Sequence, residues 1–334
     1  MKYLNIVFVL LLFTVSCKHD SKKKATEANS NTVLSGAVFG TSYKAIYNSE
    51  IDYTVQFDSL FAVLNKSMST YIFDSDISKL NRNKTVTVDD HFKTVFNAAK
   101  TIYIDTEGVF DPTIGDVVNA WRFGAETDKF LTDAKVIDSL MRYVGFDKVV
   151  IENNGLVEKP KGTYLEFNAI AKGYGVDVIS DFLEEKGITN YLVEIGGEIR
   201  VKGKNVEKNA LWRIGVDEPR FDGGQSVYKI INMVDEAMAT SGTYRKFKID
   251  EDGKKYAHII DTKTGYPSKT NILSVSVIAD KCMVADGYAT AFQAMGIDNM
   301  KLFLKEHPEL KVFLIFENEK MELETLALNG FPVK

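Results

Sequence analysis

The spacing of hydrophobic residues divides this chain into helical and extended stretches. Apolar side chains recur at helical spacing over residues 52–68, 91–106, 133–143, 171–186 and 280–295, which predicts amphipathic helices there. Shorter runs alternate between apolar and polar residues or are rich in β-branched residues, and such runs predict strands. They lie beside Gly40 and Thr41 and at 148–151, 163–167, 191–195, 199–202, 211–216, 227–231, 238–241, 271–278, 312–316 and 325–328.

Short turns separate most of these predicted strands, and the predicted helices come in blocks. This order favours an α+β fold with largely antiparallel sheets and packed helices over a regular parallel α/β array. No clean linker interrupts residues 32–334. We therefore predict a single domain over that range.

The first 31 residues have a different character. The apolar run over residues 4–15 is too short for a permanent transmembrane helix, so residues 1–17 are expected to be a targeting segment. Its end resembles a bacterial lipoprotein cleavage box, with Thr14 in place of the usual leucine, which implies a lipid on Cys17. A plain secretory signal is the alternative. Residues 18–31 are polar and rich in Lys and Ser, which predicts a flexible tether.

Composition and charge narrow the classes of function. Apolar residues make up 45% of the chain and charged residues 26%, which is ordinary for a soluble globular protein. The net charge of −5 offers no electrostatic basis for binding nucleic acid. Apart from Cys17 the only cysteine is Cys282, so we predict no disulfide framework and expect Cys282 to be a small buried hydrophobic residue.

A candidate proton acceptor lies in the stretch from His258 to Pro267. Two β-branched residues follow the histidine, and Asp261, Gly265 and Pro267 favour turns. We expect a short strand that brings His258 and Asp261 to a sheet edge, where the imidazole could take a proton from a hydroxyl near neutral pH. A structural histidine beside an ordinary turn is the alternative.

Two further stretches offer groups that bind phosphate and metal. Lys172 stands near the start of a predicted helix, where a phosphate would meet the helix N-terminus; a solvated lysine is the alternative. Asp286 and Thr290 are four residues apart and share one face of the helix predicted over 280–295. Their oxygens suit Mg²⁺, which completes its coordination with water and phosphate. A helix cap and a threonine bonded to its own helix are the alternative.

In their order along the chain, these and other motifs resemble the FAD:protein FMN transferase family, also called ApbE-like flavin transferases. The resemblance runs through most of residues 37–296. Its motifs are Phe39-Gly40-Thr41, residues 69–81, Phe110-Asp111-Pro112-Thr113-Ile114-Gly115, Ile170-Ala171-Lys172-Gly173-Tyr174, Glu194-Ile195-Gly196-Gly197-Glu198, Ala239-Thr240-Ser241-Gly242, residues 258–265, and Ala285-Asp286 with Thr290.

The resemblance implies a T-fold-like architecture and a Mg²⁺-dependent bacterial enzyme that splits FAD. Such an enzyme attaches FMN through a phosphoester bond to a Thr or Ser hydroxyl of an acceptor protein and releases AMP. The family's metal ligands correspond to the Ala169 carbonyl and the side chains of Asp286 and Thr290, and its histidine base to His258. Its FAD contacts correspond to Phe39, Tyr71, Phe110, Asp111, Pro112, Glu166, Lys172 and Ile260.

Two other residues join His258 in the predicted catalytic set. Lys172 would place a positive charge beside the FAD diphosphate, and Asp261 would hold the turn or the metal site. Three positions depart from the family pattern: Phe39 replaces methionine, Glu166 replaces aspartate, and Thr262 replaces the usual proline. We expect the Phe39 ring still to pack on a flavin or adenine ring, and Thr262 to loosen its turn.

The resemblance also suggests partners and a location. The acceptor would be a subunit of a membrane redox complex or another secreted electron-transfer protein. The lipid on Cys17 would hold the enzyme to a membrane, and we expect this to be the inner membrane, with the enzyme facing the periplasm. Two alternatives stay open, namely a Mg²⁺-dependent FAD diphosphatase that yields FMN and AMP, and a non-enzymatic lipoprotein that binds FAD.

Overall fold

The computed structural model describes residues 30–126, 130–222, 224–243, 247–249 and 255–333. The targeting segment, Cys17 and most of the predicted tether therefore lie outside the described residues. Of the helices in these ranges, none has the length and apolar character needed to cross a membrane.

The largest element of the fold is an antiparallel sheet. Within the described residues, eight strands form it in the order β1 (Thr32–Val38), β2 (Thr41–Tyr47), β5 (Tyr191–Ile195), β6 (Glu198–Lys202), β9 (Ala237–Gly242), β12 (Ile272–Ala279), β13 (Lys311–Glu317) and β14 (Leu323–Leu328). Every neighbouring pair is antiparallel. The prediction of an α+β fold with largely antiparallel sheets is confirmed.

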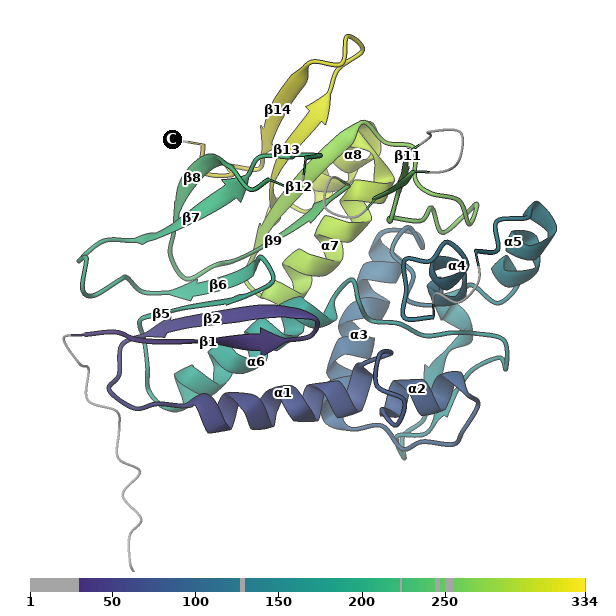
Figure 1. Ribbon diagram of the computed structural model, residues 1–334, viewed down its shortest axis with the longest axis horizontal. Coiled ribbons are helices and arrows are strands. Elements are labelled where there is room, and N and C mark those ends of the chain that lie inside the picture. The colour runs from purple at the N-terminus through teal and green to yellow at the C-terminus, as the bar shows by residue number, and fades with distance from the viewer. Residues whose placement is uncertain (1–29, 127–129, 223, 244–246, 250–254, 334) are drawn as a thin grey trace, which may run out of the picture.

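Helices cover one face of this sheet and extend beyond one of its ends (Figure 1). They are α1 (Thr54–Met68), α2 (Asp76–Asn81), α3 (Asp90–Asp105), α4 (Gly115–Ala120), α5 (Ala134–Met141), the 3₁₀ turn η1 (Phe146–Lys148), α6 (Ala171–Glu185), α7 (Cys282–Met295) and α8 (Ile297–Glu306). Helix α6 packs on β5 and β6, and α7 packs on β9 and β12. Two further strands, β7 and β8 (residues 212–217 and 227–233), lie at one end of the molecule. Helices α2 to α5 gather at the opposite end.

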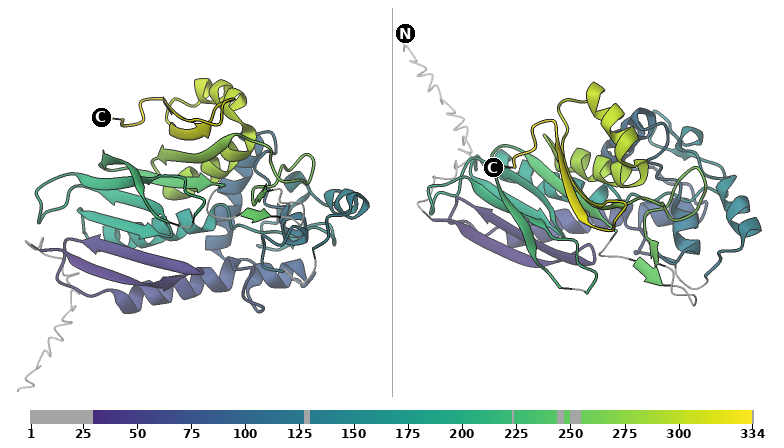
Figure 2. Two further views of the ribbon diagram at one scale, coloured as in Figure 1. Left: turned by 45° about the horizontal axis from the view of Figure 1, so that its top comes forward. Right: turned by 90° about the horizontal axis from the view of Figure 1, so that it is seen from above.

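The hairpin β7 (Trp212–Asp217) and β8 (Val227–Met233) covers the opposite face of the sheet (Figure 2). Trp212 and Ile214 from this hairpin share a buried cluster with Met238 on β9 and Phe313 on β13. Because helices lie on one side and the hairpin on the other, all eight residues of β12 are buried. That double burial explains the nearly continuous apolar run of β12.

The prediction of a strand over residues 163–167 is wrong. The Asn153–Gly155 turn instead joins β3 (Val150–Ile151) to β4 (Val157–Glu158). The Asn81 side chain takes the place of a neighbouring strand, because its amide donates to the Leu165 carbonyl and accepts from the Leu165 amide, both at 2.8 Å. A single residue on α2 thus satisfies both backbone groups of Leu165, and the segment's backbone pairing is limited to an isolated parallel bridge between Tyr164 and Ile114.

Several elements were absent from the prediction, namely β1, α2, α4, η1, β4, α8 and the hairpin of β10 (Phe247–Ile249) with β11 (Lys255–Ala257). The alternating pattern before Tyr47 conceals a tight turn between β1 and β2, where Phe39 and Gly40 have φ angles of 48° and 74°. Strand β11 ends one residue before His258 and pairs with β10. The strand predicted over His258 and the β-branched residues after it is therefore wrong: β11 precedes the histidine in a small hairpin, and after it there is only an isolated bridge between Ile260 and Pro267.

Candidate active site

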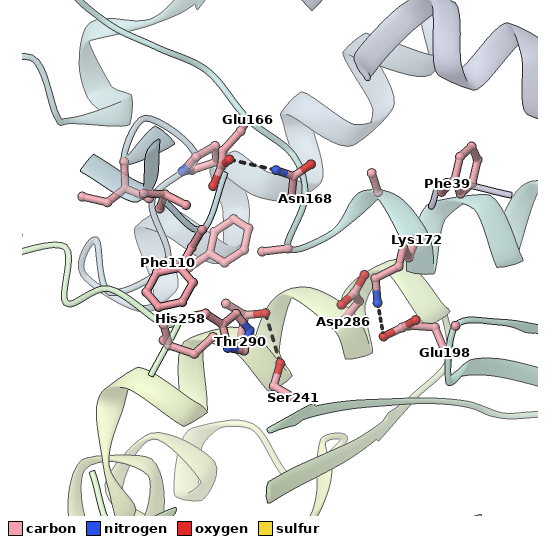
Figure 3. A pocket seen from close by; sticks show the side chains of 18 of the residues that line it. Phe39, Phe110, Glu166, Asn168, Lys172, Glu198, Ser241, His258, Asp286 and Thr290 are labelled. Carbon is pink, nitrogen blue, oxygen red and sulfur yellow. Dashed lines mark hydrogen bonds and ion pairs between the residues drawn. The ribbon is translucent and has the colours of Figure 1, made fainter. Parts of the chain in front are cut away.

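A cavity of about 940 Å³ lies among α1, α6, α7, the tip of the β1–β2 hairpin and the loops at 109–114 and 258–262. This volume is near the upper end of the range for small-molecule sites. Apart from Asp261, every residue proposed from the sequence for FAD, metal or catalysis lines this one cavity, and Figure 3 shows several of them. They are Phe39, Tyr71, Phe110, Asp111, Pro112, Glu166, Ala169, Lys172, His258, Ile260, Asp286 and Thr290.

The carboxylate of Asp261 belongs to the turn beside the cavity. It accepts hydrogen bonds from the backbone amides of Lys263 at 2.8 Å and Thr264 at 3.3 Å. The Asp261 backbone closes the same turn, because its carbonyl accepts from the Gly265 amide at 2.8 Å. Of the two roles suggested for Asp261, these contacts fit that of holding the turn.

Two side-chain hydrogen bonds fasten the turn that follows His258. The indole Nε1 of Trp121, just after α4, donates to the Gly265 carbonyl at 2.9 Å. The Thr262 hydroxyl donates to the Gly108 carbonyl at 2.6 Å. This second bond links the loop after His258 to the loop that carries Phe110. It offsets the loosening of the turn that we expected from threonine in place of proline.

Replacing Thr262 with valine should lower the free energy of unfolding by about 1 kcal/mol, because the Gly108 carbonyl loses its donor while side-chain volume is preserved. Urea denaturation of the purified protein measures this change. Thr101→Val is a matched control, since the Thr101 hydroxyl bonds only the carbonyl one turn earlier in α3. Equal effects of the two substitutions would contradict a special role for the bond between loops.

The loop over residues 110–113 holds its own shape through Asp111. The Asp111 carboxylate is buried and accepts from the Thr113 amide at 2.8 Å and the Thr113 hydroxyl at 2.6 Å. Burial raises the pKa of Asp111, although these hydrogen bonds act in the opposite direction. The Pro112 carbonyl accepts from the Glu166 amide at 2.9 Å, which joins this loop to the segment before α6. The loop is therefore rigidly placed on the cavity wall.

A buried ion pair forms another part of the wall (Figure 3). Lys172 Nζ lies 2.5 Å from Glu198 Oε1, and Glu198 is only 2% exposed. Burial alone would lower the pKa of Lys172, but the Glu198 and Asp286 carboxylates outweigh it and raise that pKa. Lys172 is therefore a permanent positive charge on the cavity wall, which favours a phosphate-bearing ligand.

Glu198 is a site residue to which no role was assigned from the sequence. It stands at the start of β6, directly after the Gly196-Gly197 turn, and its place in the Glu194–Glu198 motif was the available signal. Burial raises its pKa, and the charge of Lys172 opposes that effect. Its Oε2 atom is buried and accepts no hydrogen bond from the described residues. An unpaired buried acceptor favours a cation or donor in the cavity.

The oxygens proposed for a metal come from α7 and from the segment before α6. Asp286 is 5% exposed, and its Oδ2 accepts from the Gly173 amide at 3.0 Å. The hydroxyls of Thr290 and Ser241 are hydrogen-bonded at 3.2 Å. Among the described residues no three His, Cys, Asp or Glu side chains are grouped to bind a metal. A site here would combine one carboxylate, one hydroxyl and one carbonyl, a set of hard oxygens that fits Mg²⁺.

Comparisons with known proteins identify the family to which this chain belongs. The model of the ApbE family matches residues 39–314. The chain is 41% identical over 216 residues to the FAD:protein FMN transferase of Vibrio cholerae, which covers 64% of this chain and 63% of that protein. It is 38% identical over 239 residues to the Haemophilus influenzae protein of the same name, covering 69% and 64%. The matched region thus spans a little under two thirds of these relatives.

Solved structures show the same fold over a larger share of the chain. The structure of the flavin transferase ApbE from Vibrio cholerae superposes with a TM-score of 0.80 at 35% identity, covering 89% of this chain and 97% of that one. The apo form of the flavinyl transferase ApbE from Pseudomonas stutzeri superposes with a TM-score of 0.79 at 26% identity, covering 89% and 94%. Because the family model matches most of the length of this chain, residues 39–314, the chain belongs to the ApbE family.

Proposed function

We propose that this chain is an FAD:protein FMN transferase, which cleaves FAD, attaches FMN to a Thr or Ser hydroxyl of an acceptor protein and releases AMP. The observation that carries the proposal is the convergence of Lys172, His258, Asp286 and Thr290 on one cavity. These residues come from α6, from the loop after β11 and from α7, so only the fold brings them together. The names of the relatives support the same reaction.

The chemistry requires a proton acceptor and compensation of negative charge. His258 takes the proton from the acceptor hydroxyl, whose oxygen then forms a bond to the FMN phosphorus. The bond from that phosphorus to the oxygen of AMP breaks, and AMP leaves with the electron pair. Lys172, held by Glu198, stabilises the negative charge that develops on the phosphoryl oxygens.

Asp286, Thr290 and the Ala169 carbonyl are the residues that would hold Mg²⁺ for this reaction. When bound, the ion would withdraw charge from the diphosphate and from the departing AMP. The aromatic rings of Phe39 and Phe110 on the cavity wall offer flat apolar surfaces for the flavin or adenine ring. Tyr71, which is 64% exposed, lies at the same cavity and offers a third such ring.

The location proposed for this activity follows from the N-terminal segment. A lipid on Cys17, followed by the tether over residues 18–31, would keep the domain close to a membrane surface, with the inner membrane and its periplasmic face as the proposed site. The acceptor would then be another periplasmic or membrane-bound protein, such as a subunit of a redox complex.

The reaction can be tested by assaying AMP and protein-bound flavin in parallel. The enzyme is incubated with FAD and Mg²⁺, with or without a co-expressed candidate periplasmic acceptor. When the acceptor is present, we expect the amount of AMP released to equal the amount of flavin bound covalently to the acceptor. The bound flavin is measured by its fluorescence in a gel. AMP and free FMN without acceptor would indicate a diphosphatase, and tight FAD binding with no AMP under either condition would indicate a flavin carrier.

A further inference from the structure

Helix α7, which carries Asp286 and Thr290, begins without a cap of its own. Lys281 occupies the cap position, and its side chain makes no capping hydrogen bond. The cap comes from α6, where Asp177 Oδ1 accepts from the Cys282 amide at 3.0 Å and Oδ2 accepts from the Met283 amide at 2.9 Å. Asp177 is 3% exposed, so solvent does not compete for these bonds.

A further hydrogen bond joins the same two helices, and in this one a backbone amide of α6 donates to a side chain of α7. Four residues before Asp177, the Gly173 amide donates to Asp286 Oδ2 at 3.0 Å. Gly173 and Asp177 therefore share one face of α6 and contact α7 one turn apart. The helices are close enough that a Cβ atom on Gly173 would lie 2.4 Å from the Cys282 carbonyl oxygen and 2.8 Å from the Asp286 Cβ atom.

Strand β6 holds α6 in turn. Glu198 and Arg200 lie two residues apart and so project from the same side of the strand. Glu198 pairs with Lys172, and Arg200 Nη1 lies 3.1 Å from Asp177 Oδ1. Charge and hydrogen bonds thus connect β6 to α6 and α6 to α7, and the connection ends at the Asp286 carboxylate.

We propose that Asp177 is a positioning residue for the metal site, acting through the first turn of α7. The inference rests on the proposed function, because it assumes that Asp286 and Thr290 hold Mg²⁺. Asp286 is the fifth residue of α7, one turn beyond the amides that Asp177 binds. A shift of the first turn would move Asp286 relative to the Gly173 amide and to the Ala169 carbonyl before α6. Groups that orient a metal ligand typically change metal affinity by 10–100-fold when they are altered.

The test is Asp177→Asn, which keeps the size of the side chain but offers an NH₂ group where a second acceptor is needed. The probe is Mn²⁺, which prefers similar oxygen ligands, titrated in solution by electron paramagnetic resonance without FAD or acceptor. We expect about tenfold weaker Mn²⁺ binding and faster hydrogen exchange in the first turn of α7. With Mg²⁺ in turnover, the half-saturating concentration should rise about tenfold while kcat at saturation changes by less than twofold.

Asp181→Asn is the matched control. Asp181 lies one turn further along α6 and also pairs with Arg200, at 2.7 Å, but it contacts the side chains of Arg200 and Lys281 where Asp177 binds the α7 backbone. We expect its Mn²⁺ affinity to stay within twofold of wild type. Unchanged Mn²⁺ binding in folded Asp177→Asn, or equal weakening in both variants, would overturn the proposal.

A milder variant covers the case in which Asp177→Asn does not fold. Arg200→Lys keeps the positive charge, but a lysine has a single nitrogen. It cannot donate to Asp177 and Glu184 from separate nitrogens, as Arg200 does. About threefold weaker Mn²⁺ binding would support the inference, and unchanged binding would overturn it. Because Mn²⁺ binding requires neither FAD nor acceptor, a protein that binds the ion but transfers no FMN would refute the proposed function and leave the role of Asp177 intact.

Discussion

Replacing His258 with alanine should leave FAD binding intact and slow FMN transfer by about 10²–10⁴-fold, the usual contribution of a positioned base. His258 lines the cavity together with Phe110 and Thr290, and it directly follows β11, outside the main sheet and α7 (Figure 3). Transfer is measured as the initial rate of covalent flavin fluorescence on the acceptor, and FAD affinity by titration of flavin fluorescence.

His307→Ala serves as the control for this substitution. His307 stacks on Phe303 with ring centres 4.1 Å apart, next to α8, and it does not line the cavity. Its variant should transfer FMN within twofold of the wild-type rate. Added imidazole should restore part of the activity of His258→Ala, because a soluble base can enter the space left by the side chain. Transfer by His258→Ala at the wild-type rate would show that the base assignment is wrong.

The sequence pattern was most informative where one face of an element is buried and the other is not. Helices α1, α3 and α6 follow their predicted ranges closely, because their apolar residues recur at helical spacing. The central strands were found for a different reason, since β-branched runs bounded by turn residues identify strands even when both faces are buried. Local spacing therefore suffices for an element whose backbone pairs in the regular way.

The errors in the fold come from contacts between distant residues. The segment at 163–167 has a β-rich composition, yet the Asn81 amide takes the hydrogen bonds of Leu165, and backbone pairing is limited to an isolated bridge between Tyr164 and Ile114. Strand β1 was missed because the first residue of the turn before β2 is a phenylalanine with positive φ, so that Gly40 alone signalled the turn. Neither outcome follows from the residues of the segment alone.

The candidate site divides along the same line. Asp286 and Thr290 could be paired from their spacing on a helix, and motif order placed Lys172 and His258 in one site. The contacts of these residues depend on how the elements pack. The ion pair between Glu198 and Lys172 forms because β6 lies beside α6. The hydrogen bonds from the α7 amides to Asp177 form because α6 and α7 approach each other closely at Gly173. Sequence spacing carries no direct signal for such contacts.

Replacing Asp286 with asparagine should abolish Mg²⁺-dependent turnover and at the same time stabilise the metal-free protein at alkaline pH. Burial raises the pKa of Asp286 above its ordinary value, against the opposing effects of Lys172 and the Gly173 amide. A carboxyl group whose pKa is raised by folding favours the folded state only while it is protonated, so the ionised form costs stability above that pKa. Asparagine removes this cost and keeps an oxygen that can accept from Gly173.

Thermal unfolding in EDTA between pH 4 and pH 8 measures the effect. We expect Asp286→Asn to unfold at a higher temperature than wild type at pH 8, and the difference to shrink as the pH falls through the raised pKa and the wild-type carboxyl becomes protonated. With Mg²⁺ present, the wild type should unfold at a higher temperature than the variant. An ion at 100 times its dissociation constant stabilises the folded wild type by about 2.7 kcal/mol. The variant lacks the carboxylate that would bind the ion. Equal stabilisation of both proteins by Mg²⁺ would show that Asp286 is not a metal ligand. A stability difference that does not change with pH would show that ionisation of this carboxyl group is not what opposes folding.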